Sequence, residues 1–156
     1  MEPAAETLRL PAAYGSPSVL LGWSDVETRL SEAAHYWLAT VRPDGRPHAV
    51  PVDGLWVGGR LVFSGDPDAI HERNLARHPA VSIHLEQAEA ATILEGRAER
   101  HTPTALEAHD LACASKDKYG YAPPKSAYQA GVWRVCPRVV LAWTALYRDA
   151  TRFTFG

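Results

Sequence analysis

The sequence predicts a mainly β fold in which six or seven antiparallel strands form a barrel with peripheral helices. Two turn signals carry this prediction. In Arg42-Pro43-Asp44-Gly45, proline presets the backbone at the second turn position, and glycine supplies the positive φ of a bulged hairpin. The Gly58-Gly59 pair between two apolar runs predicts a second tight hairpin. Both connections are too short for a crossover helix, so the strands that they join are antiparallel.

One domain is expected at residues 23–156, preceded by an N-terminal arm at residues 1–22. The chain has 156 residues, of which 46% are hydrophobic and 22% are charged, and this composition is typical of a single globular core. Prolines and glycines interrupt the arm, so we expect it to be loosely ordered. A helix should follow, because Ser24 and Glu27 have the spacing of a capping box, and it should end near His35.

Alternation of apolar residues and helix start signals predict the other elements. Asp66-Pro67 predicts the start of a helix that ends near Arg77, before His78-Pro79. Thr102-Pro103 predicts a second helix that runs to about Ser115, with a loop at 116–129. A turn or short extended piece is expected at 54–58. The predicted strands are 36–42, 46–53, 60–65, 80–86, 91–100, 131–136 and 138–144, with a further terminal strand at 152–155.

Charge and composition argue against several classes of protein. The net charge is −2 and the arginines are scattered, so nothing indicates a nucleic-acid partner. No run of about 18 apolar residues predicts a membrane span, and the acidic N-terminus lacks the basic region of a signal peptide. Cys113 and Cys136 form neither a disulfide framework nor a zinc motif, which favours a reducing cytoplasm. His71 and His78 stand two helical turns apart, so no metal site is expected.

Three segments of the chain resemble a known family. They read YWLATVRPDGRPHAVPV at 36–52, LVFSG at 61–65 and RNLARHP at 73–79. The chain resembles the pyridoxamine-5′-phosphate-oxidase-like split β-barrel superfamily, in particular its actinobacterial flavin- and deazaflavin-dependent oxidoreductases. The resemblance implies a Greek-key split barrel and a homodimer, with a flavin or deazaflavin coenzyme in a groove at the dimer interface.

The resemblance also assigns coenzyme-binding positions. Strand two of the family lines the coenzyme ring, and the end of strand three and the following helix hold the phosphate. A helix N-terminus suits an anion, because it offers free N–H groups and a favourable dipole. From the residues alone, the alternative for Arg73 and Asn74 is a solvated helix face, and the alternative for His48 is an ordinary strand residue. The positions carried over are His48, Ala49, Val50, Pro51, Val52, Ser64, Gly65, His71, Arg73 and Asn74.

The chain departs from the oxidases proper where they bind phosphate. Ile70 and His71 stand at the positions of adjacent basic residues, and Asp66 and Asp68 add negative charge nearby. We therefore expect weak phosphate binding. The C-terminal Arg and His that true pyridoxamine-phosphate oxidases use have no clear match, so oxidation of vitamin B6 is not expected.

No nucleophilic triad or other catalytic motif is visible, which suits a reaction in which the coenzyme supplies the chemistry. Trp56, Tyr119, Tyr121 and Trp133 are candidates for the walls of an acceptor pocket, or are core and interface aromatics. The expected function is hydride transfer from reduced coenzyme F-420 to a small organic acceptor, with FMN as the alternative coenzyme. The alternative function is a split-barrel protein that binds flavin or haem without turnover, or that binds no coenzyme.

Overall fold

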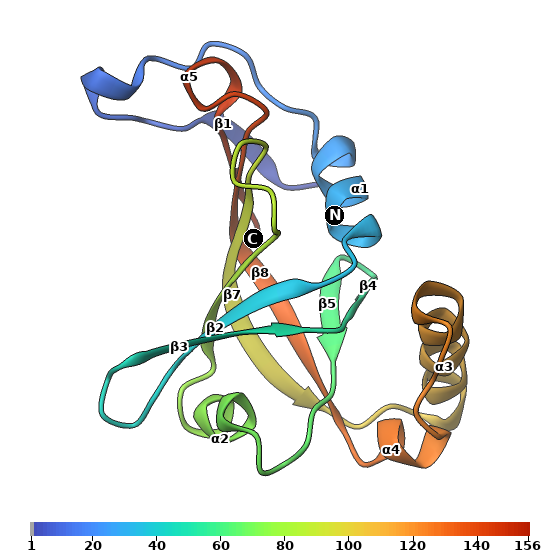
Figure 1. The fold of residues 1–156 in the computed structure, drawn as a ribbon. Coiled ribbons are helices and arrows are strands. Elements are labelled where there is room, and N and C mark those ends of the chain that lie inside the picture. The colour runs from blue at the N-terminus through green and yellow to red at the C-terminus, as the bar shows by residue number, and fades with distance from the viewer. Residues whose placement is uncertain (1) are drawn as a thin grey trace.

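The computed structural model describes residues 2–156, which form a single nine-stranded sheet with helices at its margins (Figure 1). The strand order is β1-β9-β8-β7-β6-β2-β3, β5 also pairs with β8, and β4 pairs with β5; every pairing is antiparallel. The strands are β1 (Ala4–Thr7), β2 (Tyr36–Val41), β3 (Pro47–Val52), β4 (Leu55–Val57), β5 (Arg60–Phe63), β6 (Ala80–His84), β7 (Thr92–His101), β8 (Val132–Ala142) and β9 (Thr151–Thr154).

The antiparallel β class is confirmed, although nine strands exceed the expected six or seven. The two hairpin predictions are also confirmed, since Gly45 has φ 84° and Gly58 and Gly59 have φ 58° and 74°. Within residues 2–156, β3 pairs only with β2 and β4 only with β5, so the sheet stays open between these two edges.

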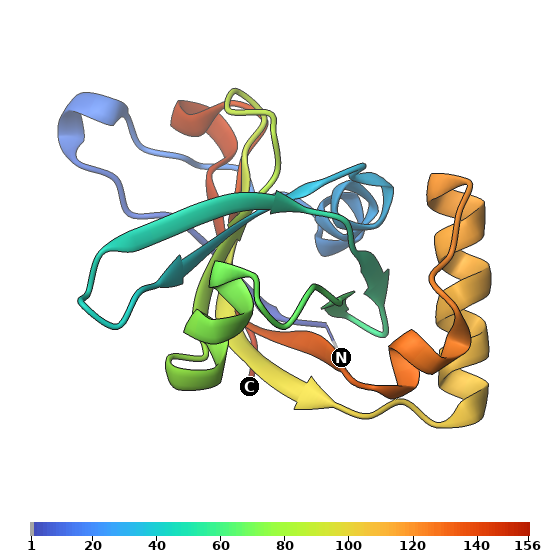
Figure 2. The same ribbon diagram turned by 60° about the horizontal axis from the view of Figure 1, so that its bottom comes forward.

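The helices lie around the margins of the sheet. Figures 1 and 2 show α2 beside the β2–β3 hairpin, whereas α3 stands on the other side of β4 and β5. None of the helices in residues 2–156 has both the length and the apolar character to cross a membrane. The helices are α1 (Trp23–Glu32), α2 (Ile70–Arg77), α3 (Ala105–Tyr119), α4 (Lys125–Gln129) and α5 (Leu146–Asp149), with a short 3₁₀ helix η1 (Ala12–Tyr14).

Strand β8 corrects the prediction of two separate strands at 131–136 and 138–144. It continues through Pro137, which lies opposite Gly96, and a bulge at Arg138 shifts the register between Glu95 and Gly96. Glycine is required at position 96, since a Cβ there would lie 2.4 Å from the carbonyl oxygen of Cys136. Strand β8 can therefore pair with β7, β9 and β5 along its length.

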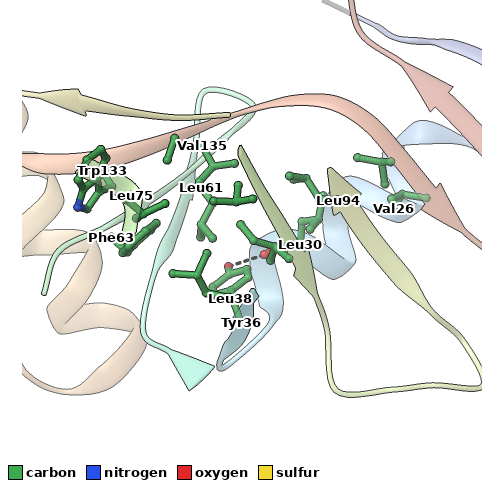
Figure 3. Close-up of a cluster of buried hydrophobic side chains, with 14 of the residues drawn as sticks. Val26, Leu30, Tyr36, Leu38, Leu61, Phe63, Leu75, Leu94, Trp133 and Val135 are labelled. Carbon is green, nitrogen blue, oxygen red and sulfur yellow. Dashed lines mark hydrogen bonds between the residues drawn. The ribbon is translucent and has the colours of Figure 1, made fainter. Parts of the chain in front are cut away.

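The main core lies between the sheet and α1 (Figure 3). Val26 and Leu30, one turn apart on α1, are buried against strand residues that include Leu38 and Leu94. Tyr36 is fully buried, and its hydroxyl donates a 2.6 Å hydrogen bond to the carbonyl of Leu30. Each large side chain buried in this way contributes about 1.5–3 kcal/mol. This bond and the core contacts join α1 to β2.

Several predicted element boundaries are wrong. Helix α1 starts at Trp23 after Gly22, without a side-chain cap, and ends at Glu32 rather than near His35. Glu27 does not close a capping box, because its carboxylate accepts a 3.2 Å hydrogen bond from Trp56 Nε1. Helix α2 starts at Ile70 rather than near Asp66, because Asp66 Oδ1 accepts the N–H of Asp68 in a turn before the helix.

The segment after β7 is more helical than predicted. Thr104 and Glu107 form a reciprocal capping box at the start of α3. The helix continues past Ser115 to Tyr119, where Gly120 ends it with φ 77°. Helix α4 occupies part of the predicted loop at 116–129. A second apolar cluster joins α3 and α4 to the outer side of β4, β5 and β8, through Leu55, Val62, Ala108, Leu111, Tyr128 and Val132.

The N-terminal arm is more ordered than expected. Strand β1 pairs with β9, from Ala4 opposite Thr154 to Thr7 opposite Thr151. Further along the arm, the Leu8 N–H donates to the carbonyl of Ala150, and the Leu21 N–H donates to the hydroxyl of Thr151. The arm is thus held by the C-terminal part of the sheet. Strand β1 was not predicted, because a strand of four exposed residues carries little sequence signal.

Candidate functional site

A cleft of about 410 Å³ lies between the ends of β3 and β5 and the C-terminal end of α3. We call it the tyrosine cleft. Its walls are mainly aromatic and apolar, and among residues 2–156 neither a lysine nor an arginine lines it. The lining residues are Pro51, Val52, Asp53, Gly54, Leu55, Val62, Phe63, Ser64, Gly65, His71, Ser115, Tyr119, Tyr121, Pro123 and Tyr128.

Gly54 anchors one wall of this cleft. Its N–H donates a 2.9 Å hydrogen bond to the Tyr119 hydroxyl, which in turn donates to the carbonyl of Ala34 at 2.8 Å. Lys118 Nζ donates to the Gly54 carbonyl at 2.9 Å and to the Tyr36 hydroxyl at 3.0 Å. Burial lowers the pKa of Lys118 and raises the pKa of Tyr119. The network fixes the position of the Tyr119 ring relative to the β3–β4 connection.

Asp53 holds the second tyrosine of the cleft. Its carboxylate lies 3.0 Å from His35 Nδ1 and accepts a short hydrogen bond from the Tyr121 hydroxyl. That hydrogen bond is the main reason why the pKa of Tyr121 is raised. The rings of Tyr119 and Tyr121 have their centroids 6.1 Å apart. The two phenols therefore stay protonated and form a neutral aromatic wall.

The floor of the cleft at Gly65 has an unusual electrostatic character. A Cβ on Gly65 would lie 2.9 Å from His71 Nε2 and 2.9 Å from Glu72 Oε1. The Glu72 side chain is 7% exposed, and its Oε2 accepts a 2.7 Å hydrogen bond from Trp133 Nε1, with Arg100 more distant at 3.4 Å. Its Oε1 is buried without a hydrogen-bond partner among the residues described.

His71 does not offset this carboxylate with a fixed positive charge. Burial lowers the pKa of His71, and the nearby charge of Glu72 raises it by less. An imidazole with a pKa below about 6.5 is mostly neutral at pH 7. At the Gly65 corner of the cleft, the Glu72 carboxylate therefore lies beside a mostly neutral His71, and the charge of Arg100 is already paired with that carboxylate.

A second cleft, of about 580 Å³, lies between the β2–β3 hairpin and α2. We call it the arginine cleft, because four arginines line it. Arg46 is paired with Asp44 at 2.8 Å. Within residues 2–156, the side chains of the other three make no hydrogen bond or ion pair. The lining residues are Arg42, Pro43, Asp44, Arg46, Ile70, Arg73, Asn74, Ala76 and Arg77.

Half of the residues predicted to bind the coenzyme or to line the acceptor pocket lie together in the tyrosine cleft. Tyr119 and Tyr121, predicted for the acceptor, lie there together with residues predicted for the coenzyme. The sequence could not show that α3 extends far enough to bring these tyrosines to the end of β3. The predicted residues found in this cleft are Pro51, Val52, Ser64, Gly65, His71, Tyr119 and Tyr121.

The other predicted residues lie elsewhere. Arg73 lines the arginine cleft, and Asn74 is buried there, with its amide donating a 3.0 Å hydrogen bond to the hydroxyl of Thr40. Trp56 packs against the main core and bonds to Glu27, whereas Trp133 is a buried core residue. His48, Ala49 and Val50 lie on β3 and line neither cleft.

His48 on β3 lies on the side of the hairpin that faces α2. It stands opposite Thr40 of β2, which accepts the hydrogen bond from Asn74 of α2. Its Nδ1 is buried without a hydrogen-bond partner among the described residues. Burial is the main cause that lowers the pKa of His48, and the positive charge of Arg42 lowers it further.

Sequence reasoning missed several residues that shape the site. Lys118 stands in the predicted loop at 116–129, where no local signal marks it. Asp53 directly follows β3, where a polar residue after an apolar strand is a weak signal. Glu72 has no sequence signal, because an acidic residue in the first turn of a helix is ordinary. No group of three or more potential metal ligands occurs within residues 2–156.

Comparison with known proteins places this geometry in a family. Among solved structures, an F420 reductase matches with 24% identity and a TM-score of 0.58, over 73% of this chain and 94% of that one. A conserved hypothetical protein from Mycobacterium tuberculosis matches with 16% identity and a TM-score of 0.65, over 90% and 89% of the two chains. A heme binding protein from Mycobacterium smegmatis matches with 23% identity and a TM-score of 0.59, over 92% and 63%.

These likenesses show the shared fold. No curated protein sequence matches the chain. The family model described as pyridoxamine 5′-phosphate oxidase matches residues 24–143, which include β2 to β8 and both clefts. The chain therefore belongs to the pyridoxamine 5′-phosphate oxidase family, within its split-barrel superfamily.

Proposed function

We propose that the protein is an oxidoreductase that holds the ring of reduced coenzyme F-420, or of FMN as the alternative, in the tyrosine cleft. The acceptor is a small organic molecule bound beside the ring. The observation that carries this proposal is the convergence of Pro51 and Val52 of β3 with Gly65, Tyr119 and Tyr121 on one cleft of about 410 Å³. Family membership and the fold shared with an F420 reductase support it.

The cleft suits the ring of such a coenzyme. A flat aromatic ring packs well against proline, valine and tyrosine side chains. The phosphate of the coenzyme does not fit at Gly65, because Glu72 is buried there as a carboxylate and His71 is mostly neutral. The residues of this corner therefore differ in chemistry from the basic phosphate site that the family resemblance implies.

The chain's own residues would position the reactants. A bound reduced flavin or deazaflavin supplies a hydride to an acceptor. Asp53 holds the Tyr121 hydroxyl in one orientation, so that its remaining lone pair can accept a hydrogen bond from the acceptor. Gly54 and Lys118 fix Tyr119 and Tyr36 behind it. The rings of Tyr119 and Tyr121 would shield one side of a bound ring from water.

The functional unit of this proposal is a homodimer with the coenzyme groove at its interface. Strand β3 is an unpaired edge with Pro47, Ala49 and Pro51 exposed, and Tyr121 at the cleft mouth is 54% exposed. Apolar surface of this kind often marks an interface. Light scattering at micromolar concentration should give about twice the chain mass of 17.1 kDa. A stable monomer would contradict the shared groove.

The direct test is a titration of the purified protein with F-420 and, separately, with FMN and riboflavin, followed by fluorescence. Tyr121→Ala removes one wall of the cleft and should weaken ring binding about tenfold. Tyr147→Ala is the matched control, because Tyr147 is 67% exposed on α5 and lines neither cleft. Binding of none of the three coenzymes, or equal binding by both variants, would overturn the proposal and favour a split-barrel protein without this activity.

A further inference from the structure

The arginine cleft has positive charge that the rest of the chain does not neutralise. Asp44 pairs with Arg46, which leaves Arg42, Arg73 and Arg77 without an acidic partner among the described residues. Arg73 and Arg77 stand at i and i+4 of α2, where like charges repel. This concentration of positive charge occurs in a chain with a net charge of −2. An anion is the kind of ligand that would relieve this repulsion.

The cleft is held by a defined framework. Arg42 and Arg46 flank the β2–β3 turn, in which the Gly45 N–H donates to the Arg42 carbonyl at 2.9 Å. Asn74 joins α2 to β2 through its 3.0 Å hydrogen bond to Thr40, and both side chains are buried. The β2–β3 hairpin and α2, which carry the arginines, are thus fixed relative to each other. Guanidinium groups in such an arrangement can bind phosphate or carboxylate oxygens in pairs.

The two clefts are neighbours on α2. His71 lines the tyrosine cleft, and Arg73, two residues later, lines the arginine cleft. His48 of β3 lies opposite Thr40 of β2, and Thr40 accepts a hydrogen bond from Asn74 of α2, so His48 lies on the side of the hairpin that faces α2. A ligand with its ring in the tyrosine cleft can therefore extend along α2, past His48, toward the arginines.

We infer that the arginine cleft binds the anionic end, a phosphate or carboxylate group, of the same small molecule whose ring lies in the tyrosine cleft. This inference rests on the proposed function for the identity of the ring, but the anion site itself rests on the arginines. It moves the anion away from Gly65, where Glu72 repels it, to Arg42, Arg73 and Arg77. The inference thus assigns ring binding and charge binding to separate clefts.

The test uses the full chain and two kinds of probe. The first is pyrophosphate, measured by calorimetry, which reports the anion site without a ring. The second is the ratio of FMN to riboflavin affinity, which reports whether the phosphate of a ring-containing ligand reaches the same site. The variant R73Q/R77Q removes two arginines of the cleft. The variant R60Q/R138Q removes two exposed arginines that line neither cleft, and so controls for net charge.

In the wild type, pyrophosphate should bind, and FMN should bind about tenfold more tightly than riboflavin. R73Q/R77Q should lose both effects while riboflavin affinity stays unchanged, and R60Q/R138Q should keep both. Equal affinity for FMN and riboflavin in the wild type would overturn the inference and leave the proposed function standing. Equal loss of pyrophosphate binding in the two variants would also overturn the inference. Arginine-dependent binding of pyrophosphate by a protein that binds no flavin and no F-420 would instead overturn the proposed function and keep the anion site.

Discussion

The tyrosine cleft and the arginine cleft share helix α2 but have opposite chemistry. His71 faces the aromatic cleft, which has no lysine or arginine, whereas Arg73 and Arg77 face a cleft with four arginines. Ile70 lines the arginine cleft and the next residue, His71, lines the tyrosine cleft, because each residue advances about 100° around a helix. A single short helix can thus separate a site for an apolar ring from a site for an anion. The side of α2 on which each basic residue lies therefore matters more than the number of basic residues.

The largest expected effect concerns the buried carboxylate beneath the tyrosine cleft. Trp133→Phe removes the 2.7 Å hydrogen bond to Glu72 and leaves the carboxylate with only a distant arginine. We expect a loss of about 2–4 kcal/mol in the free energy of unfolding, because a buried charged group loses its main partner. Urea unfolding of the variant measures this loss.

Glu72→Gln supplies the control for that prediction. The neutral amide still accepts the indole N–H, so Trp133→Phe should cost less in this background than in the wild type. The double-mutant cycle isolates the contribution of the negative charge. Equal costs in both backgrounds would mean that Glu72 is not held as a buried carboxylate, and the contrast between the two clefts would weaken.

A smaller effect is expected at the turn that carries the arginines. Gly45 has φ 84° and no atom within 4 Å of its Cβ position, so the cost of a side chain there comes from backbone conformation alone. Gly45→Ala should lower the free energy of unfolding by about 1–2 kcal/mol. Gly45→Asn should cost less, because asparagine tolerates the left-handed conformation better. Unchanged stability in Gly45→Ala, measured by thermal unfolding, would show that the turn can relax.

The smallest effect on stability concerns two histidines, His48 on β3 and His71 in the tyrosine cleft. The pKa values of His48 and His71 are both lowered, mainly by burial, so the folded chain binds fewer protons than the unfolded chain. Their contribution to stability is therefore fully present above the unfolded pKa of about 6.5 and is lost as the pH falls below that value. Unfolding of the wild type and of a His48→Gln, His71→Gln double variant between pH 8 and 5 measures the difference. The double variant should show a shallower loss, and identical profiles would mean that neither histidine is buried as described.

Much of the fold could be predicted from local sequence. The turn chemistry at Gly45 and Gly59 located two hairpins, because positive φ is a local property of glycine. The end of α2 before Pro79 was predicted for the same local reason. The start of α2 was wrong, because Asp66-Pro67 also favours a turn and tertiary contacts choose between the two. The continuity of β8 through Pro137 depends on Gly96 of a distant strand, which no local signal reports.

The site was less predictable than the fold. The family pattern placed Gly65 and His71 near a coenzyme, and the structure does bring them together in one cleft. The family pattern could not show that Glu72 turns inward to Trp133, sixty-one positions away along the chain. It also could not show that Arg73 lines the cleft beside the β2–β3 hairpin. Whether a charged side chain faces a cleft or the core is decided by packing between distant segments, and periodicity alone does not specify it.

The attachment of the N-terminal arm has a consequence for the order of folding. Strand β1 pairs only with β9 among the residues described, and Leu8 and Leu21 bond to Ala150 and Thr151. Bringing together segments so far apart in the chain has a high entropic cost, and such contacts form slowly. During synthesis on the ribosome, the arm emerges well before β9. The arm therefore waits for its partners, and it takes its native place only after β9 has been made.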